Sequence, residues 1–340
     1  MKAISQRISQ ILLVLGIAFF SFFFWAKSHT LASDQWFTLK KYQFEKRTNA
    51  PDSVFSIISY NIGYLSGMSN NLAVPLTREA LLSNLTKVVE TWQKLQPDLV
   101  AYQEIDFDGK RAFHLNQSDT LAKAVGFPFA LDAVNWDKRY LPFPFALNLA
   151  LHYGRILSGQ TLHSRFELTP LERKELQRIK TYNFFYDAFY IDRLAMVAKV
   201  QIQQRSLIII NVHLEAFDRP TRLAQVKEVL ALFRAYAKIY PVILLGDFNA
   251  HAPTKAYRQS KDYEPTIDLL LNEPNLKAAC PPENFSQKGF FTYSSANPAE
   301  HIDYIFYTPA TIEIIDYKTL TEVGTASDHL PVWAKWKFKN

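Results

Sequence analysis

From residue 54 onward, short apolar runs alternate with longer segments in which apolar residues recur at helical spacing. Residues 77–95 show the helical pattern most clearly, because Leu85, Val88 and Trp92 recur three or four positions apart and would line one face of a helix. A second helix is predicted over residues 220–237. The apolar runs predict strands over residues 54–60, 98–102, 194–200, 206–212, 242–245, 304–307 and 331–335.

The order of these elements predicts a mixed α/β sandwich of sheets. Several strands are joined by short connections and others by helices, which distinguishes the pattern from a purely doubly wound sheet. Residues 106–193 show the weakest pattern; within them 171–180 are basic and helix-like, and 182–186 are rich in aromatic residues. Such aromatic density is typical of core and sheet packing, and it is also compatible with a surface that contacts substrate or a bilayer.

The N-terminus carries a uniformly apolar run, residues 11–26, which follows Lys2 and Arg7. Its 16 residues are long for the core of a signal peptide and short for a membrane span, which needs about 17–25. We predict a signal anchor or signal peptide over residues 1–32, in contact with the membrane through residues 8–26. An uncleaved anchor is favoured because the run ends in bulky aromatic residues.

The rest of the chain is predicted to be a polar linker, residues 33–52, followed by one catalytic domain, residues 53–340. An N-terminal signal or anchor normally places the following domain outside the cytoplasm, so we predict a membrane-anchored or secreted protein with an extracytoplasmic domain. Hydrophobic residues make up 48% of the chain and aromatics 14%, which excludes a disordered or fibrous protein. The net charge of +6 is compatible with nucleic acid, anionic lipid or phosphorylated substrates.

Several chemistries are excluded because their sequence features are missing. The chain contains one cysteine, Cys280, so it can form neither an intramolecular disulfide nor a cysteine-based zinc site. The Gly-x-Ser-x-Gly motif of serine hydrolases and the Gly-x-x-x-x-Gly-Lys-Ser/Thr phosphate loop are both absent.

Polar side chains stand at the ends of several predicted strands. Asp247 and Asn249 alternate at one strand end, so both would point to the same side and meet at a pocket rim, although a Gly-Asp-x-Asn turn fits the same residues. Glu104 follows another strand and is a natural Mg²⁺ ligand, and Asn61 would support the same ligand shell. His213 ends a further strand, where it would either donate to a phosphoryl oxygen or be a satisfied strand-end histidine.

Two carboxylates and a histidine complete this set of candidates. Asp328 and His329 are adjacent, which can place one group on a metal and the other at the scissile bond, although such pairs are commonly surface residues. Asp303 lies within an apolar strand, where a buried carboxylate needs a partner. A histidine is the economical partner, because the carboxylate would fix the tautomer of the ring and raise its basicity.

In chain order, these motifs resemble those of the endonuclease/exonuclease/phosphatase superfamily, which has the deoxyribonuclease-I-like fold. The resemblance covers roughly residues 54–338 and rests on the strings ISYNIG, AYQEI, INVHLE, LLGDFN, HIDYIF and ASDHLPV. It implies a four-layer α/β sandwich of two mixed β-sheets flanked by helices, here preceded by an N-terminal hydrophobic helix. It also implies cleavage of phosphoester bonds with Mg²⁺ or Mn²⁺.

The resemblance implies a role for each matching residue. Glu104 would bind the metal with assistance from Asn61 and Asp328. Asp247 and Asn249 would orient the attacking water and a phosphate oxygen.

By the same resemblance, His329 paired with Asp303 would activate the water, and His213 would stabilise the pentavalent transition state. One departure concerns a strand of Gly-Asn-Ala-Ile-Leu-Ser-Arg type that many members carry between the glutamate and histidine motifs. The nearest match here is residues 153–159, which are followed by an unusual aromatic stretch. That region helps to shape substrate choice.

We therefore predict a Mg²⁺-dependent phosphoesterase that hydrolyses a phosphodiester by metal-assisted attack of a histidine-activated water. The apolar N-terminus, the basic linker and the aromatic insertion favour a phospholipid or sphingolipid head group as substrate. A membrane-tethered or secreted nuclease acting on DNA or RNA is the alternative, because basic charge also suits a nucleic acid backbone. A catalytically inactive binding module on the same fold predicts lost ligands, and here none of the main positions is missing.

Overall fold

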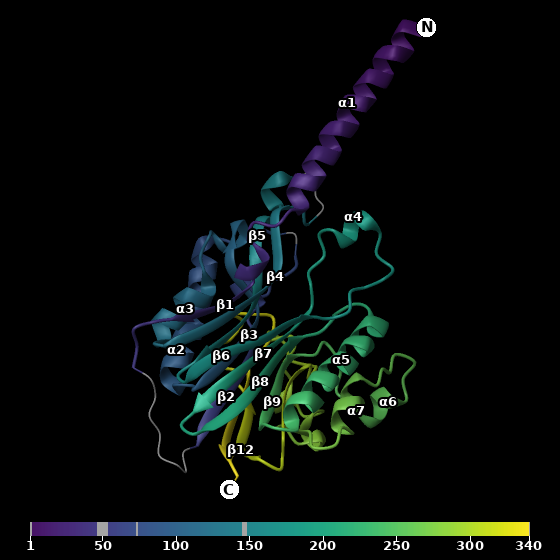
Figure 1. Cartoon of the computed structure of the whole chain (residues 1–340). Coiled ribbons are helices and arrows are strands. Elements are labelled where there is room, and N and C mark those ends of the chain that lie inside the picture. Colours follow the sequence, from purple (N-terminus) through teal and green to yellow (C-terminus); the bar gives the residue numbers. More distant parts are fainter. Residues whose placement is uncertain (1, 46–53, 73, 145–147, 340) are drawn as a thin grey trace.

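A computed structural model of the chain describes residues 2–45, 54–72, 74–144 and 148–339, and in this part of the chain the strands form two packed sheets (Figure 1). The first sheet has the strand order β1 (Phe37–Lys41), β4 (Phe129–Leu141), β5 (Gly154–Ser164), β3 (Leu99–Gly109), β2 (Phe55–Asn61), β13 (Val332–Phe338) and β12 (Ile312–Thr319). β2 and β3 are parallel neighbours, so Asn61 at the end of β2 pairs with Gln103, next to Glu104.

The second sheet has the strand order β10 (Lys277–Ala278), β11 (Asp303–Tyr307), β9 (Val242–Asp247), β8 (Arg205–His213), β7 (Leu194–Ile202) and β6 (Glu167–Glu175). β8 and β9 are parallel, which places His213 beside Asp247 at their carboxyl ends. β11 is antiparallel to β9, and Asp303 at its start pairs with Asp247. Strand register therefore brings three predicted site residues together.

The two sheets pack face to face around an apolar core. On β2, Ile57 points into this core while Ile58 points to the outer face, as the two-residue period of a strand requires. On β8, Ile209 and Ile210 divide in the same way. All four are fully buried because both faces of each strand are covered, which explains why these strands are continuous apolar runs in the sequence.

Helices cover the outer face of each sheet (Figure 1). α2 (Arg78–Leu95) and α3 (Gln117–Val125) pack on the first sheet, and α5 (Arg219–Ala237) and α7 (Thr266–Leu271) pack on the second. The side chains of Thr77 and Asp218 cap α2 and α5 by accepting a backbone N–H of the first turn. Two inner sheets and two helical layers confirm the predicted four-layer α/β sandwich.

The predicted N-terminal hydrophobic helix is present as α1 (Lys2–Lys27), which projects away from the sandwich (Figure 1). From Ile4 to Lys27 it is long and apolar enough to cross a membrane, and little of its apolar length is buried against the domain. A signal sequence has the same length and composition, so anchoring and cleavage stay predictions.

Two segments differ from the sequence prediction. Within the predicted linker, residues 37–41 form β1, which pairs with β4 and packs Phe37 and Leu39 against the core; residues 46–52 of the linker lie outside the described residues. Of the helix-like residues 171–180, residues 171–175 instead belong to β6, an edge strand paired with β7, and residues 176–180 lie in the connection that follows it. Pairing with β7 overrides the helix propensity of its Glu, Arg and Lys residues.

The remaining short elements lie in connections. They are α4 (Phe184–Asp187), α6 (Lys255–Arg258), η1 (Ser33–Gln35), η2 (Gly63–Leu65), η3 (Lys110–Ala112), η4 (Leu149–Leu151), η5 (Pro282–Asn284) and η6 (Lys288–Phe290). α4 belongs to the loop between β6 and β7, and η4 belongs to the loop between β4 and β5. Figure 1 shows α4 at the end of the domain where α1 emerges.

Candidate active site

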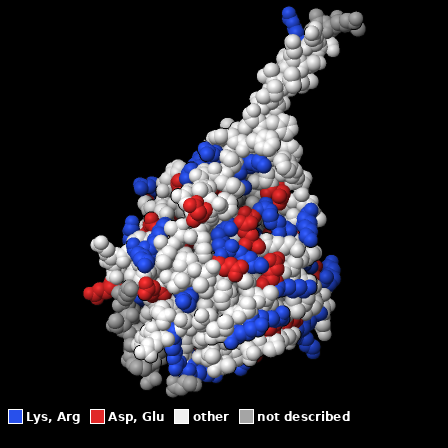
Figure 2. Space-filling model, in the orientation of Figure 1, with Lys and Arg blue, Asp and Glu red and all other residues white. Residues whose placement is uncertain are grey.

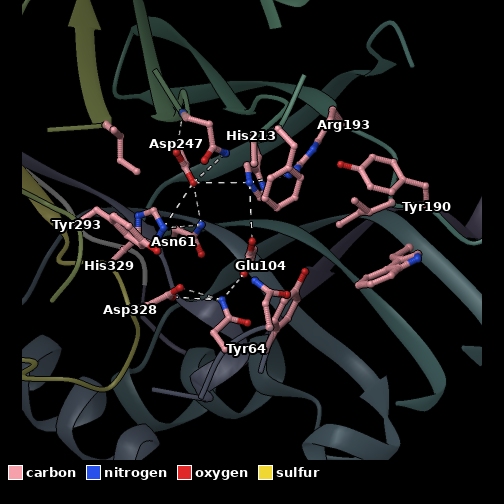
Figure 3. Close-up of a pocket in the computed structure, with 18 of the residues that line it drawn as sticks. Asn61, Tyr64, Glu104, Tyr190, Arg193, His213, Asp247, Tyr293, Asp328 and His329 are labelled. Atoms are coloured by element: carbon pink, nitrogen blue, oxygen red, sulfur yellow. Dashed lines mark hydrogen bonds and ion pairs between the residues drawn. The ribbon is translucent and has the colours of Figure 1, made fainter. Parts of the chain in front are cut away.

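The eight residues predicted from the motifs meet at one edge of the sandwich, where the carboxyl ends of β2, β8 and β9 lie beside the bend in β3 and the start of β11. Figure 3 labels Asn61, Glu104, His213, Asp247, Asp328 and His329 among them. Seven of them line one cavity: Asn61, Glu104, His213, Asp247, Asn249, Asp328 and His329. The eighth, Asp303, lies behind His329 and is fully buried. The sheets therefore assemble residues that are far apart in sequence.

Asp303 and His329 form a hydrogen-bonded pair. Nδ1 of His329 lies 2.9 Å from Oδ2 of Asp303, so Nδ1 carries a proton and donates it to the carboxylate. Nε2 of His329 is then directed at the polar side chains of the cavity, 3.5 Å from Nδ2 of Asn61 and 3.8 Å from Oδ2 of Asp247. The partner that a buried Asp303 requires is His329.

Proton affinities are shifted at this pair and at its neighbour. Burial lowers the pKa of His329, but the charges of Asp303 and Asp247 outweigh burial and raise this pKa well above its ordinary value. Burial, together with the charge of Asp303, raises the pKa of Asp247 to about 7. Both groups therefore hold a proton more firmly than usual, and perturbed proton affinities of this kind are typical of general acid–base sites.

Asp247 is held by amide groups on two sides. Its Oδ2 accepts hydrogen bonds from Nδ2 of Asn61 at 2.9 Å and of Asn249 at 3.3 Å, and its Oδ1 accepts one from the backbone N–H of Asn249 at 2.8 Å. Both sequence interpretations of Asp247 and Asn249 therefore hold, since the two side chains meet at the pocket rim and also close a turn. A Cβ at Gly246 would lie 1.9 Å from the carbonyl oxygen of Val212, so this glycine permits the close approach of β9 to β8.

Glu104 reaches the cavity through a bulge in β3. The pairing of β3 with β5 shifts between Tyr102 and Ile105, so Gln103 and Glu104 together oppose one residue. Gln103 stays inside and donates to Oδ1 of Asn211 at 2.7 Å. Glu104 has a φ of 51°, which is uncommon for glutamate and is a form of strain that clusters at functional sites.

Glu104 and Asp328 converge on a single amide nitrogen. Nδ2 of Asn70 donates to Oε2 of Glu104 at 2.9 Å and lies 3.2 and 3.3 Å from the two carboxylate oxygens of Asp328. A Cβ at Gly63 would lie 2.7 Å from Oδ1 of Asp328, so only glycine leaves room for this carboxylate. Burial raises the pKa of Glu104, and the charge of Asp328 raises it further. Two carboxylates that converge on one donor fit a divalent cation with oxygen ligands.

Asn61 contacts the acid–base group directly. Its Nδ2 donates to Asp247, and its Oδ1 accepts from the backbone N–H of Gly63 at 3.0 Å. Asp247, Asp303 and His329 also present three ligand atoms within 4.8 Å of one another. A hydrogen bond already joins two of these residues, Asp303 and His329, so this group suits proton transfer better than it suits a cation.

His213 lies between the two groups, with Nε2 3.8 Å from Glu104 and 3.6 Å from Asp247. The same Nε2 accepts a hydrogen bond from Nη1 of Arg193 at 2.7 Å, because a guanidinium can only donate. Burial and the charge of Arg193 lower the pKa of His213 well below its ordinary value. His213 is therefore neutral, and in this arrangement its Nε2 has no proton to give to a substrate oxygen.

Arg193 is a site residue that none of the motifs includes. It is buried, and its Nε donates to Oε2 of Glu215 at 3.3 Å, while Tyr190 donates to Oε1 of Glu215 at 2.8 Å. Arg193 directly precedes Leu194, which pairs with His213. The pairing of β7 with β8 is thus the signal that could have identified this arginine from the sequence.

The polar residues occupy one end of a cavity of about 580 Å³. Aromatic side chains line the rest of the cavity, among them Trp136, Phe143, Tyr186, Phe189, Tyr190 and Phe217. Figure 3 shows Tyr190 on the side away from Asp328 and His329. Tyr293 flanks His329, with ring centres 5.0 Å apart. The cavity therefore has a polar end made of strand ends and an aromatic end made largely of the loops that contain η4 and α4.

Comparison with known proteins agrees with this arrangement. The family model described as "Endonuclease/Exonuclease/phosphatase family" matches residues 58–329. No curated protein matches the sequence.

Solved structures share the fold at low sequence identity. An endonuclease/exonuclease/phosphatase from Beutenbergia cavernae has a TM-score of 0.61 and 17% identity, over 84% of this chain and 72% of that chain. The human nocturnin catalytic domain has a TM-score of 0.57 and 16% identity, over 87% of this chain and 98% of that chain. A mannosyl-6-phosphatase from Bacteroides thetaiotaomicron has a TM-score of 0.56 and 16% identity, over 84% and 100%.

Proposed function

The chain belongs to the endonuclease/exonuclease/phosphatase family, and from this premise we propose that it is a metal-dependent phosphodiesterase acting on a phospholipid or sphingolipid head group. The observation that carries the proposal is the Asp303–His329 pair, joined at 2.9 Å, in a site whose cavity is also lined by the Glu104 and Asp328 carboxylates. A base and a cation site that share one cavity supply both elements of metal-assisted phosphoester hydrolysis.

We assign water activation to His329. With Nδ1 donating to Asp303, a neutral Nε2 would accept a proton from water, and Asp303 would stabilise the imidazolium that forms. Asp247 and Asn61 lie 3.8 and 3.5 Å from this nitrogen, where they can orient the water. The raised pKa of His329 makes the neutral ring a strong proton acceptor.

Glu104 and Asp328 would hold the divalent cation. Mg²⁺ suits this pair, because it takes one or two carboxylates and completes its shell with water and phosphate oxygens. When bound, the cation would neutralise charge on the phosphoryl group and position it. Asn70, which donates to both carboxylates, marks where their oxygens converge.

Arg193 would bind the phosphoryl oxygens. Its guanidinium donates to His213 and Glu215 and keeps further N–H donors on the side of the cavity. A donor fixed in this way stabilises the charge that develops in a pentavalent transition state. The stabilising role implied for His213 then falls mainly on Arg193, which His213 helps to hold in place.

The aromatic end of the cavity supports a lipid substrate. A phosphodiester bound at the polar end would leave its glycerol or ceramide portion beside Phe143, Phe189 and Phe217. The apolar helix α1 would keep the enzyme at a membrane, where such substrates are concentrated.

A nuclease acting on DNA or RNA is the second candidate, and the tyrosine and tryptophan rings of the cavity favour it. Trp136, Tyr186 and Tyr190 line the cavity, and rings of this kind stack with the bases of single strands. Binding of a nucleic acid backbone would weaken steeply with added salt, whereas binding of a neutral lipid would not.

Hydrolysis by the purified full-length protein with Mg²⁺ tests the proposal. The panel would hold plasmid DNA, RNA, sphingomyelin vesicles, glycerophospholipid vesicles and inositol phosphates, with His329→Ala as the inactive variant. We expect head-group release from one lipid class, lost with chelator and in His329→Ala. Cleavage of DNA or RNA alone would establish the nuclease instead. Activity that survives His329→Ala would overturn the assigned base, and Mg²⁺ binding without any hydrolysis would favour an inactive binding module.

A further inference from the structure

The base of α1 packs against the loop that carries α4. The ring of Phe23, which is buried, lies 5.4 Å from Phe184, 5.1 Å from Phe185 and 5.6 Å from Phe189, measured between ring centres. Phe19, one turn earlier on α1, lies 6.0 Å from Phe185. α4 therefore lies beside the last two turns of α1.

The loop between β4 and β5 also reaches the base of α1. The ring of Phe22 lies 5.6 Å from that of Tyr140 near the end of β4, and the hydroxyl of Tyr140 lies 2.7 Å from Nδ1 of His152 beyond η4. In the same loop Leu149 of η4 is 67% exposed.

Large apolar side chains stay exposed on all three of these elements. We call them the α1–α4 surface: Phe22, Phe24 and Trp25 of α1, Leu149 of η4, and Phe184 and Phe185 of α4. Phe184 is 57% exposed and Phe185 is 45% exposed, although α4 has only four residues. An exposed group of apolar side chains of this size marks a surface that contacts a partner.

A lipid bilayer is the partner that matches the dimensions of α1. The 24 residues from Ile4 to Lys27 rise about 1.5 Å each and so extend about 36 Å, more than the roughly 30 Å of a hydrocarbon core. Phe19, which contacts Phe185, lies about 12 Å from Lys27 along the axis. With Lys27 at the level of the lipid head groups, α4 lies at the depth of the last two turns of α1, because Phe185 contacts both Phe19 and Phe23.

A lysine and an arginine lie at the same level of the molecule. Nζ of Lys27 lies 5.3 Å from the ring centre of Phe184, and Arg178 pairs with Asp187 at the end of α4 at 2.9 Å. Figure 2 shows an uncharged shaft of α1 and basic side chains where it meets the domain. Lysine and arginine beside an apolar surface are suited to the head-group region, where they meet lipid phosphates.

The α1–α4 surface is continuous with the cavity. Phe189 contacts Phe23 of α1 and also lines the cavity. Tyr186, the residue after Phe185, lines the cavity as well. Phe143, from the loop that contains η4, lines the cavity as well. Apolar contacts therefore run from the end of α1 into the aromatic end of the cavity.

We propose that the α1–α4 surface lies in the head-group region of the bilayer that α1 crosses, so that the aromatic end of the cavity opens toward lipids of the adjacent leaflet. The proposal rests on the phosphodiesterase function above and narrows its substrate to a lipid of the enzyme's own membrane. The phosphodiester of that lipid reaches the polar end of the cavity while its acyl chains stay in the bilayer.

Label depth tests the membrane contact without requiring catalysis. Because the chain has one cysteine, Cys280, which is buried, Phe185→Cys can carry a fluorescent label in the full-length protein in phosphatidylcholine–phosphatidylglycerol vesicles. Ile239→Cys, at a residue 75% exposed just beyond α5, is the control. A quencher attached to lipid acyl chains should quench the label at 185 and spare the label at 239. Equal quenching at both positions, or none at 185, would contradict the contact whether or not the protein is a phosphodiesterase.

Activity on two substrates tests the substrate class. Phe184→Ser with Phe185→Ser should lower hydrolysis of vesicle phospholipid by about tenfold or more, since two apolar anchors are lost, and leave hydrolysis of soluble bis(p-nitrophenyl) phosphate unchanged. Ile239→Ser with Ile315→Ser, which removes two exposed apolar side chains outside the cavity lining, should change neither. An equal loss on both substrates would mean that α4 supports the cavity and does not contact the membrane. No hydrolysis of either substrate by the unaltered protein would sink the phosphodiesterase function and leave the label result standing.

Discussion

The two ends of the cavity are held by different kinds of structure. At the polar end, His213, Asp247 and Asp303 stand in register on three paired strands, and all three are buried. At the aromatic end, Tyr186 and Phe189 come from the connection between β6 and β7, where the ring of Tyr186 packs on Tyr190 and the ring of Phe189 packs on Phe23 of α1. Strand pairing sets positions within tenths of an ångström, whereas loops accept changes in sequence and length.

This difference separates the proposed chemistry from the proposed choice of substrate. Proton transfer and cation binding need fixed geometry, which the strand ends provide. Recognition of a lipid needs an apolar wall whose details can vary. A change at the polar end should therefore lower activity on every substrate alike, and a change at the aromatic end should lower it on lipid substrates alone.

Asp303→Asn should give the largest effect and test the polar end most directly. The amide keeps the shape of the side chain but removes the charge that orients His329 and raises its pKa. We expect turnover to fall roughly 1,000-fold, because a wrong tautomer disables a histidine base. Steady-state rates on vesicle lipid and on a soluble diester should fall together. Asp316→Asn, at an exposed carboxylate of β12, is the matched control, and a loss confined to one substrate would break the comparison.

Glu104→Gln should weaken Mg²⁺ binding on the order of 100-fold, because one of the two converging carboxylates loses its charge. Titration calorimetry with Mg²⁺ alone measures this without any substrate. Glu322→Gln, at an exposed position, should leave the affinity unchanged. An unaltered affinity in Glu104→Gln would move the cation site to Asp247, Asp303 and His329, the other group whose ligand atoms lie within 4.8 Å of one another.

The polar end could be predicted from the sequence because its residues sit at the ends of apolar runs. Those runs located β2, β8, β9 and β11 to within two residues of their observed bounds. The need of a buried carboxylate for a partner then pointed to a histidine for Asp303, and the structure supplies His329. In each case one short segment contains both the side chain and the strand that positions it.

The other parts of the fold and of the site could not be predicted, because they depend on contacts between segments that are far apart in the sequence. β1 and β6 are edge strands with few apolar residues, and only pairing with β4 and β7 makes them strands. Arg193 joins the site through the register of β7 with β8, and Asn70 reaches the carboxylates from a loop. The aromatic residues 182–186 fitted both a core and a contact surface, and only the folded chain shows that they are half-buried or exposed beside α1.

His163 allows the pH response of the fold to be measured apart from that of the site. It is fully buried in β5, outside the cavity lining, and burial lowers its pKa to about 3. In the unfolded chain this pKa is about 6.5, so the unfolded state binds more protons at pH values between the two. Stability therefore falls as pH drops below 6.5, by up to about 1.4 kcal/mol per pH unit.

Between about pH 6.5 and 5, the free energy of unfolding of the native protein should decrease. We expect this decrease to be smaller by about 1–2 kcal/mol in His163→Gln. Urea unfolding at each pH measures this difference. Gln287→Asn, which exchanges one exposed uncharged side chain for another, is the control and should leave the pH slope unchanged. A slope in His163→Gln equal to that of the native protein would mean that His163 is protonated in the folded state.

Tyr190 belongs to both ends of the cavity and gives the finest test of the comparison. Its hydroxyl donates at 2.8 Å to Glu215, which in turn accepts from Arg193, while its ring packs with those of Tyr182 and Tyr186. Tyr190→Phe removes the hydroxyl alone. Because Glu215 still holds Arg193, we expect kcat/KM to fall only about threefold, and equally on vesicle lipid and a soluble diester.

Tyr190→Leu removes the ring as well, and the further loss should appear on vesicle lipid alone, because the ring contributes to the wall and not to the chemistry. The two variants thus separate the effect of the hydroxyl at the polar end of the cavity from the effect of the ring at the aromatic end. If Tyr190→Phe lowered lipid hydrolysis and spared the soluble diester, the hydroxyl would serve the lipid rather than Glu215. The separation of chemistry from substrate choice would then fail at the residue where the two ends meet.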